Sequence, residues 1–212
     1  MKKILVIATI ILAVALAAYW LYTTNGGKPE YQQSEINVAK NGKALIVFFS
    51  HAGDNTRVGN IEVGNTKILA DYVKDITGAD QFEVVPLKDY NMSYRDLTKL
   101  AKQELESGEK PPYKGRVDSL EQYKTIFVGT PIWWNTFPQV MFSFFDDHNL
   151  NGKLIVPFTT HEGSKLGRVV TDLQRLFPDA TITGAFTMRG QDVRTGRADV
   201  EEWLRSLGYT IK

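Results

Sequence analysis

Cysteine is absent from the 212-residue sequence, which excludes disulfide bonds, thiolate metal sites and a cysteine nucleophile. Histidine is scarce: His51, His148 and His161 are scattered, so a histidine-rich metal cluster is not expected. Two phosphate-binding motifs are also missing, the Gly-x-x-x-x-Gly-Lys of nucleotide triphosphatases and the Gly-x-Gly-x-x-Gly of dinucleotide-binding proteins. There is no excess of positive charge either, because 25 basic and 24 acidic residues give a net charge of +1. This balance argues against a nucleic-acid partner.

The amino terminus carries a long apolar run. Lys2 and Lys3 precede it, and residues 4–22 contain no charged side chain. As a helix, this run would be about 28 Å long, close to the ~30 Å thickness of the hydrocarbon core of a bilayer. Trp20 and Tyr22 stand where aromatic residues meet the membrane surface, and the lysines hold the amino end inside. We therefore expect residues 1–22 to be a signal anchor in the cell membrane, with the domain on the extracytoplasmic side.

A cleaved signal peptide is the alternative, because residues 13–17 contain small-x-small patterns typical of cleavage sites. The domain would then be secreted. The apolar run continues past these sites through residues 19–22, which favours the uncleaved anchor. A buried core helix is disfavoured by the basic start and the unbroken run. Residues 23–42 are polar and rich in turn formers, which predicts a spacer whose end attaches to the domain through Ile36 and Val38.

Short apolar runs alternate with helical patterns through residues 43–212, which we expect to form the domain. Strands are expected at residues 44–49, 81–87, 125–130, 154–158 and 181–188, and each is followed by apolar residues at helical spacing. Ser93 and Asp96 have the spacing of a capping box before the second helix. This alternation predicts an α/β fold with a doubly wound, five-stranded parallel sheet. Ligands of such sheets bind beyond the carboxyl ends of the strands, so the loops there are the candidate site.

The loop after the first strand can hold an anion. Ser50 ends the strand, and Asn65 and Thr66 stand where the helical spacing begins. Backbone amides and the helix dipole favour negative charge at that point. The loop carries no lysine, which favours a monophosphate held by neutral donors. Residues 53–56 are a second candidate cradle, and a plain helix cap without a ligand is the alternative.

Two adjacent tryptophans, Trp133 and Trp134, follow the third strand. Both cannot easily be buried in one core, so at least one is expected to face the cleft, where a flat aromatic surface suits a planar ring system. Closure of the sheet end, or a protein contact, is the alternative. After the fourth strand, residues 159–164 offer hydroxyl groups and the imidazole of His161 to the polar rim of such a ring.

Three motifs in this order, Ser50 with Gly64-Asn65-Thr66, Pro131-Ile132-Trp133-Trp134 and the segment 159–164, resemble the flavodoxin-like family. The resemblance covers about residues 43–212 and implies the strand order 2-1-3-4-5 and non-covalent FMN. It implies that the phosphate of FMN binds at Ser50, Asn65 and Thr66. The residues implied beside the isoalloxazine ring are Pro131, Ile132, Trp133, Trp134, Thr160, His161 and Gly163. The first loop is longer than a short flavodoxin loop, so Asn55 and Thr56 are alternatives for the phosphate.

The membrane segment and the resemblance together predict an exported, membrane-anchored FMN protein. It would act as an oxidoreductase or an electron carrier, with a small molecule or a protein as its redox partner. His161 would be the catalytic residue, because its imidazole can hydrogen-bond the flavin edge where negative charge develops on reduction. A flavin-free module for partner recognition is the alternative. A serine hydrolase is disfavoured, because Ser50 lacks the flanking glycines of a nucleophile elbow. Arg189, Arg194 and Arg197 follow the fifth strand and could meet an anionic substrate, but a plain surface loop is favoured.

Overall fold

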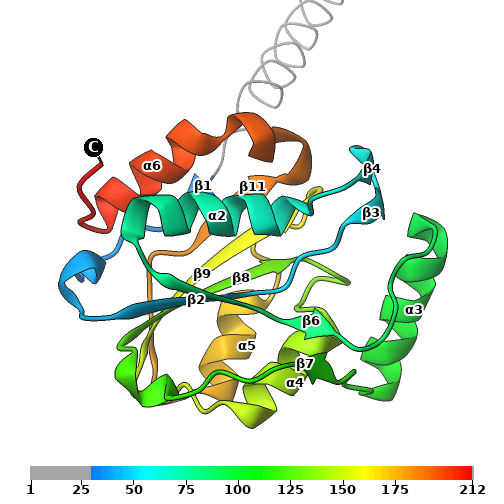
Figure 1. Ribbon diagram of the computed structural model, residues 1–212, viewed down its shortest axis with the longest axis horizontal. Helices are drawn as coiled ribbons and strands as arrows, with labels where there is room; N and C mark the ends of the chain where they lie inside the picture. Colours follow the sequence, from blue (N-terminus) through cyan, green and yellow to red (C-terminus); the bar gives the residue numbers. More distant parts are fainter. Residues whose placement is uncertain (1–29, 212) are drawn as a thin grey trace, which may run out of the picture.

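A central sheet covered by helices on both faces organises the chain (Figure 1). The computed structural model describes residues 30–211. Its strands are β1 (Glu30–Tyr31), β2 (Ala44–Phe48), β3 (Gly53–Asn55), β4 (Gly59–Ile61), β5 (Asp80–Glu83), β6 (Val85–Pro86), β7 (Tyr113–Lys114), β8 (Thr125–Pro131), β9 (Leu154–His161), β10 (Thr181–Ile182) and β11 (Phe186–Arg189). Its α-helices are α2 (Asn65–Thr77), α3 (Tyr94–Ser107), α4 (Gln139–Asp147), α5 (Val169–Leu176) and α6 (Arg197–Ser206). The 3-10 helices η1 (Val38–Lys40), η2 (Leu120–Gln122) and η3 (Gly190–Thr195) lie between them.

The main sheet has the order β1-β11-β9-β8-β2-β5, with β10 also beside β9. All of its pairs are parallel except β1 with β11. The five expected strands correspond to β2, β5, β8, β9 and β11, so the predicted order 2-1-3-4-5 is confirmed. The central strands are buried nearly throughout, as continuous apolar runs in a sheet covered on both faces should be.

Two apolar cores hold the layers together. On one face α2 and α6 cover the sheet, with Leu69 and Trp203 fully buried against it. On the other face lie α4 and α5, and α3 flanks them, contributing Leu97 (Figure 1). Because both faces are covered, the accessible backbone lies at the strand ends. The carboxyl ends point toward the β3–β4 hairpin and α3, at the right of Figure 1.

Several strands differ in length from the expected ones. Residues 81–87 divide into β5 and β6, and β6 leaves the main sheet to pair antiparallel with β7. Residues 181–188 divide into β10 and β11, and Gly184, with a φ of +63°, lies in the irregular segment between them. In contrast, β9 continues through His161 because it pairs with β11 along that length. Residues 159–161 therefore lie on a strand, whereas the sequence predicted a loop there.

Two segments join the fold that the sequence did not assign to it. The loop after β2 forms the antiparallel β3–β4 hairpin. Part of the expected spacer is also structured, since β1 pairs with β11 and Val38 is buried, while Ile36 is exposed. The expected anchor at residues 1–22 lies outside the described residues. Within residues 30–211, no helix combines the length and the apolar character needed to cross a membrane.

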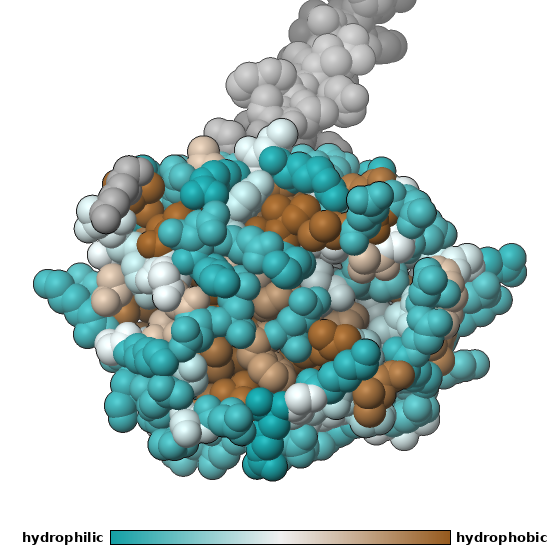
Figure 2. Space-filling model, in the orientation of Figure 1, coloured by the Kyte–Doolittle hydropathy of each residue, from teal (hydrophilic) through white to brown (hydrophobic). Residues whose placement is uncertain are grey.

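The face seen in Figure 2 is mainly hydrophilic, and its apolar side chains form small, separate patches. Among the described residues, six large apolar side chains are exposed: Ile36, Val63, Val85, Leu87, Tyr94 and Trp134. Scattered exposed apolar side chains are ordinary for a globular domain. Tyr94 and Trp134 differ from the others because both line the cavity described next.

Candidate functional site

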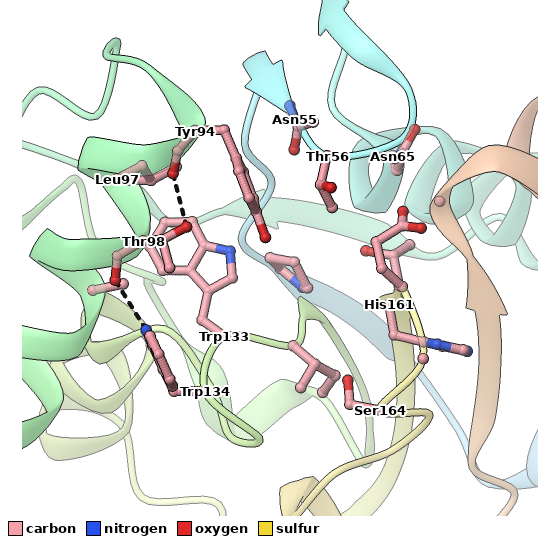
Figure 3. Close-up of a pocket in the computed structure, with 17 residues that line it drawn as sticks. Asn55, Thr56, Asn65, Tyr94, Leu97, Thr98, Trp133, Trp134, His161 and Ser164 are labelled. Atoms are coloured by element: carbon pink, nitrogen blue, oxygen red, sulfur yellow. Dashed lines mark hydrogen bonds between the residues drawn. The ribbon is translucent and has the colours of Figure 1, made fainter.

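A cavity of about 320 Å³ opens where the carboxyl ends of β8 and β9 meet the amino end of α2. Residues 131–134 form an aromatic wall of the cavity, and residues 160–164 form its floor. Asn55 and Thr56 of the hairpin lie on the same side as Asn65 (Figure 3). One wall comes from α3. The cavity has the size typical of a small-molecule site. Eight of the ten expected cofactor residues line it, and the other two, Ser50 and Thr66, hold the amino end of α2.

The amino end of α2 presents hydrogen-bond donors to the cavity. The hydroxyl of Ser50 accepts a hydrogen bond from the backbone amide of Lys67 at 2.9 Å, and it keeps a proton to donate. The hydroxyl of Thr66 hydrogen-bonds that of Thr160 at 2.8 Å, joining α2 to β9. Since the first amides of a helix have no partner within it, this end can bind an anion.

Glycines keep this end of the cavity clear. A Cβ on Gly64 would lie 2.3 Å from the Oγ of Ser50 and 2.5 Å from the carbonyl oxygen of His51. A Cβ on Gly190 would lie 2.5 Å from the Nδ2 of Asn65 and 2.6 Å from the Oε1 of Glu162. Only glycine fits at either position without a shift of its neighbours. The amino end of α2 with Ser50, Gly64 and Gly190, called the cradle below, therefore suits a small anionic group and leaves no room for an added side chain.

Trp133 is held from behind by other aromatic rings. Its ring meets those of Phe49 at 5.4 Å, Tyr90 at 5.5 Å and His51 at 6.1 Å, all edge to face. Burial lowers the pKa of His51, which keeps this neighbour uncharged at neutral pH. Such edge-to-face contacts fix the orientation of the indole. Trp133 therefore presents a rigid aromatic surface to the cavity (Figure 3).

Trp134 is positioned by a two-residue turn. Trp133 and Thr136 exchange both backbone hydrogen bonds, and between them Trp134 and Asn135 have φ values of +48° and +67°. Such values match a type I′ turn, which rarely holds a tryptophan. The indole Nε1 donates to the carbonyl oxygen of Thr98 on α3 at 3.0 Å (Figure 3). This bond fixes a side chain that is 45% exposed against the α3 wall.

His161 does not face the cavity as expected. The residue belongs to the floor of the cavity, but the imidazole points away from Trp133 toward β11 (Figure 3). Its Nδ1 is buried without a hydrogen-bond partner. Desolvation, followed by the positive charge of Arg189, lowers the pKa of His161 to about 4, so the ring is neutral at pH 7. Side chains alternate along a strand, which explains why Thr160 faces α2 and His161 the opposite face.

The sequence did not indicate some parts of the site. Tyr94, Leu97, Thr98 and Ala101 line the cavity from α3, and only their helical spacing was visible in the sequence. Arg194 is exposed on η3, and its guanidinium donates to the Oδ1 of Asn65 at 3.1 Å, a contact that the sequence did not indicate. Within residues 30–211, no group of histidine and acidic side chains could hold a metal ion.

The fold and the cavity define a flavodoxin-like α/β protein in which an aromatic wall stands beside a helix amino terminus. Residues 43–207 match the family model described as flavodoxin, and the chain belongs to the flavodoxin family. This membership supports FMN as the cofactor that the resemblance implied. A search of curated proteins found no match.

Solved structures share this fold. A protein from Bacteroides eggerthii, assigned as a flavoprotein, is 25% identical with a TM-score of 0.63, over 81% of this chain and 100% of the other. One from Bacteroides uniformis, assigned in the same way, is 26% identical with a TM-score of 0.62, over 78% and 99%. A flavoprotein from Lactobacillus acidophilus, in complex with FMN, is 17% identical with a TM-score of 0.54, over 76% and 98%. At that identity the similarity shows the fold alone.

Proposed function

We propose that this chain binds FMN non-covalently in the cavity. The observation that carries the proposal is the pairing of an anion cradle at α2 with an aromatic wall at the end of β8, both lining one cavity. The cradle, with the amide of Asn65 and the hydroxyl of Ser50, suits the phosphate. The indoles of Trp133 and Trp134 suit a planar ring.

The bound flavin would supply the redox chemistry, and the protein would orient it and control access to it. Trp133 is rigid and half-buried, so it excludes water from one side of the ring site. Trp134 is more exposed and lies nearer to an approaching partner. Thr160 and Gly163 line the floor of the cavity. The function is that of an oxidoreductase or an electron carrier, with a small molecule or a protein as redox partner.

We also propose that the domain is exported and anchored in the cell membrane. The support is the uncharged run at residues 4–22 behind two lysines. The near-neutral net charge of +1 also differs from the strongly acidic character typical of electron-carrier flavodoxins. An exported domain would exchange electrons outside the cytoplasm.

Titration of the purified chain with FMN, followed by absorption and flavin fluorescence, tests the cofactor. We expect saturable binding with a shifted flavin spectrum. Trp134→Ala, at a partly exposed position, should weaken binding about tenfold, or ~1.4 kcal/mol, through loss of aromatic contact. Trp133→Phe should weaken it less, because a smaller ring remains.

Tyr72→Ala is the matched control, since this aromatic residue on α2 does not line the cavity. Stepwise photoreduction of the bound flavin would then separate a one-electron carrier from a two-electron oxidoreductase. Absence of FMN binding by the unmodified chain would contradict the proposal and favour a flavin-free module for partner recognition. Unchanged affinity in both tryptophan variants would contradict the proposed stacking alone.

A further inference from the structure

The tip of the β3–β4 hairpin holds a charged residue in a rare backbone conformation. Arg57 has a φ of +63°, and the amide of Val58 donates to the carbonyl oxygen of Thr56 at 2.8 Å across it. These features define a γ-turn with positive φ, which is strained for any residue except glycine. The flanking residues Asn55 and Thr56 line the cavity, so the turn carries Arg57 to its rim.

Arg57 reaches across the cavity rim to the end of β9. Its Nε lies 3.4 Å from the Oε2 of Glu162, an ion pair with no hydrogen bond between the two groups. The side chain of Arg57 is 56% exposed, and this is its one ion pair among residues 30–211. A guanidinium has five N–H donors, so most of its hydrogen-bonding capacity is unused. The pair is loose, and its arginine can take another anionic partner.

Glu162 is an unusually placed carboxylate. Its Oε2 is buried, and burial raises the pKa of the group, although the charge of Arg57 opposes this shift. An added Cβ on Gly190 would lie 2.6 Å from the Oε1 of Glu162 and 2.5 Å from the Nδ2 of Asn65, so both groups border the same small space. A carboxylate therefore stands beside the amide that begins α2, where an anion is favoured.

Asn65 is oriented to donate at this point. Arg194 donates to its Oδ1 at 3.1 Å and to the carbonyl oxygen of Val63 at 3.3 Å. The Nδ2 of Asn65 is thereby left on the side of Gly190 and Glu162. Arg194 is occupied by these protein acceptors, whereas Arg57 is not. Two arginines thus flank the cradle in different roles, one holding Asn65 and the other able to change partner.

We infer that Arg57 selects the phosphorylated form of the flavin, and that Glu162 is its partner when no phosphate is bound. This inference rests on the proposed function. When the phosphate enters the cradle, the guanidinium exchanges the carboxylate of Glu162 for the phosphate oxygens, a charge-assisted contact that arginine makes well. Riboflavin, which has no phosphate, would gain nothing from the exchange. Glu162 competes with the phosphate for Arg57, and its negative charge also repels the phosphate.

Parallel titrations of the full chain with FMN and riboflavin test this inference. Arg57→Ala should weaken FMN binding at least about tenfold and change riboflavin binding less than about threefold. Arg57→Lys should fall between, because it keeps the charge and loses the planar fork. Arg197→Ala is the matched control: this arginine pairs with Asp75 and Glu201 outside the cavity, and its removal changes the net charge equally.

Glu162→Gln separates partner exchange from a merely structural ion pair. If the pair only holds the hairpin in place, losing either member should weaken FMN binding. If the partners exchange, Glu162→Gln should tighten FMN relative to riboflavin, opposite in direction to Arg57→Ala. Equal weakening of both flavins by Arg57→Ala, or weaker FMN binding in Glu162→Gln, would overturn the inference while FMN binding itself stands. If the unmodified chain binds neither flavin, the proposed function fails and the inference with it.

Discussion

At the scale of single residues, the cradle depends on the missing side chain of Gly64. We expect Gly64→Ala to destabilise the domain by about 1–3 kcal/mol, because the new methyl group meets Ser50 and the backbone of His51. FMN affinity should fall as well, since the amino end of α2 must shift. Thermal unfolding and FMN titration measure the two effects.

Gly163→Ala provides the matched control, because a Cβ at that position meets nothing within 4 Å. Gly163 also lines the cavity. The free energy of unfolding of the Gly163→Ala variant should stay within about 0.5 kcal/mol of that of the unmodified chain. Equal losses in the two variants would show that the close packing around Gly64 is not what limits substitution.

Most of the residues at the cavity could be predicted from the sequence. Asn65, Thr160 and the tryptophans stand at the ends of apolar runs, and a parallel sheet brings those ends together. The direction of the His161 side chain could not be predicted, because this direction depends on how far β9 continues past its apolar residues. A strand longer by three residues places neighbouring side chains on opposite faces.

At the scale of elements, α3 is the wall that holds Trp134. Ser93 caps this helix, accepting a hydrogen bond from the amide of Asp96, as the capping-box spacing predicted. Ser93→Ala should cost about 1 kcal/mol, or roughly 2–4 °C in Tm for a domain of this size. FMN binding should weaken as well, because Thr98 on α3 holds the indole of Trp134.

Ser119→Ala is the corresponding control, since Ser119 precedes η2 without a side-chain capping bond. Its Tm should change little. If Ser93→Ala leaves both Tm and FMN affinity unchanged, α3 does not depend on its cap for its place beside Trp134.

The type and order of the main elements followed from periodicity, because each buried strand and amphipathic helix shows its own apolar repeat. The β3–β4 hairpin did not follow from periodicity, since residues 53–61 are mostly polar and lack alternation. Its position depends on contacts distant in sequence: the amide of Tyr94 donates to Asp54 at 2.8 Å. The place of α3 beside the cavity is a tertiary property of the same kind.

At the scale of the whole molecule, stability should fall in mild acid because His161 is buried in its neutral form. The unfolded chain binds this proton near pH 6.5 and the folded chain only near pH 4. The loss therefore begins below about pH 6.5, grows to at most ~3 kcal/mol, and is complete near pH 4.

Denaturant unfolding of the unmodified chain and of His161→Gln, from pH 8 to pH 4, measures this contribution. The variant should lose less stability over that range, because glutamine does not titrate. Identical slopes for the two proteins would show that other groups cause the acid dependence.

The antiparallel strand β1 has a consequence for how copies of this protein meet. It covers Phe186 and Thr187 on β11, and the amide of Gln32 adds a bond to the carbonyl oxygen of Ala185. Without it, β11 would be an open sheet edge with unpaired backbone groups, which invites pairing between chains. The two residues of β1, which precede the region matched by the family model, thus protect this edge against edge-to-edge aggregation. A fragment that begins at Lys43 would lose this protecting strand while keeping every residue that lines the cavity.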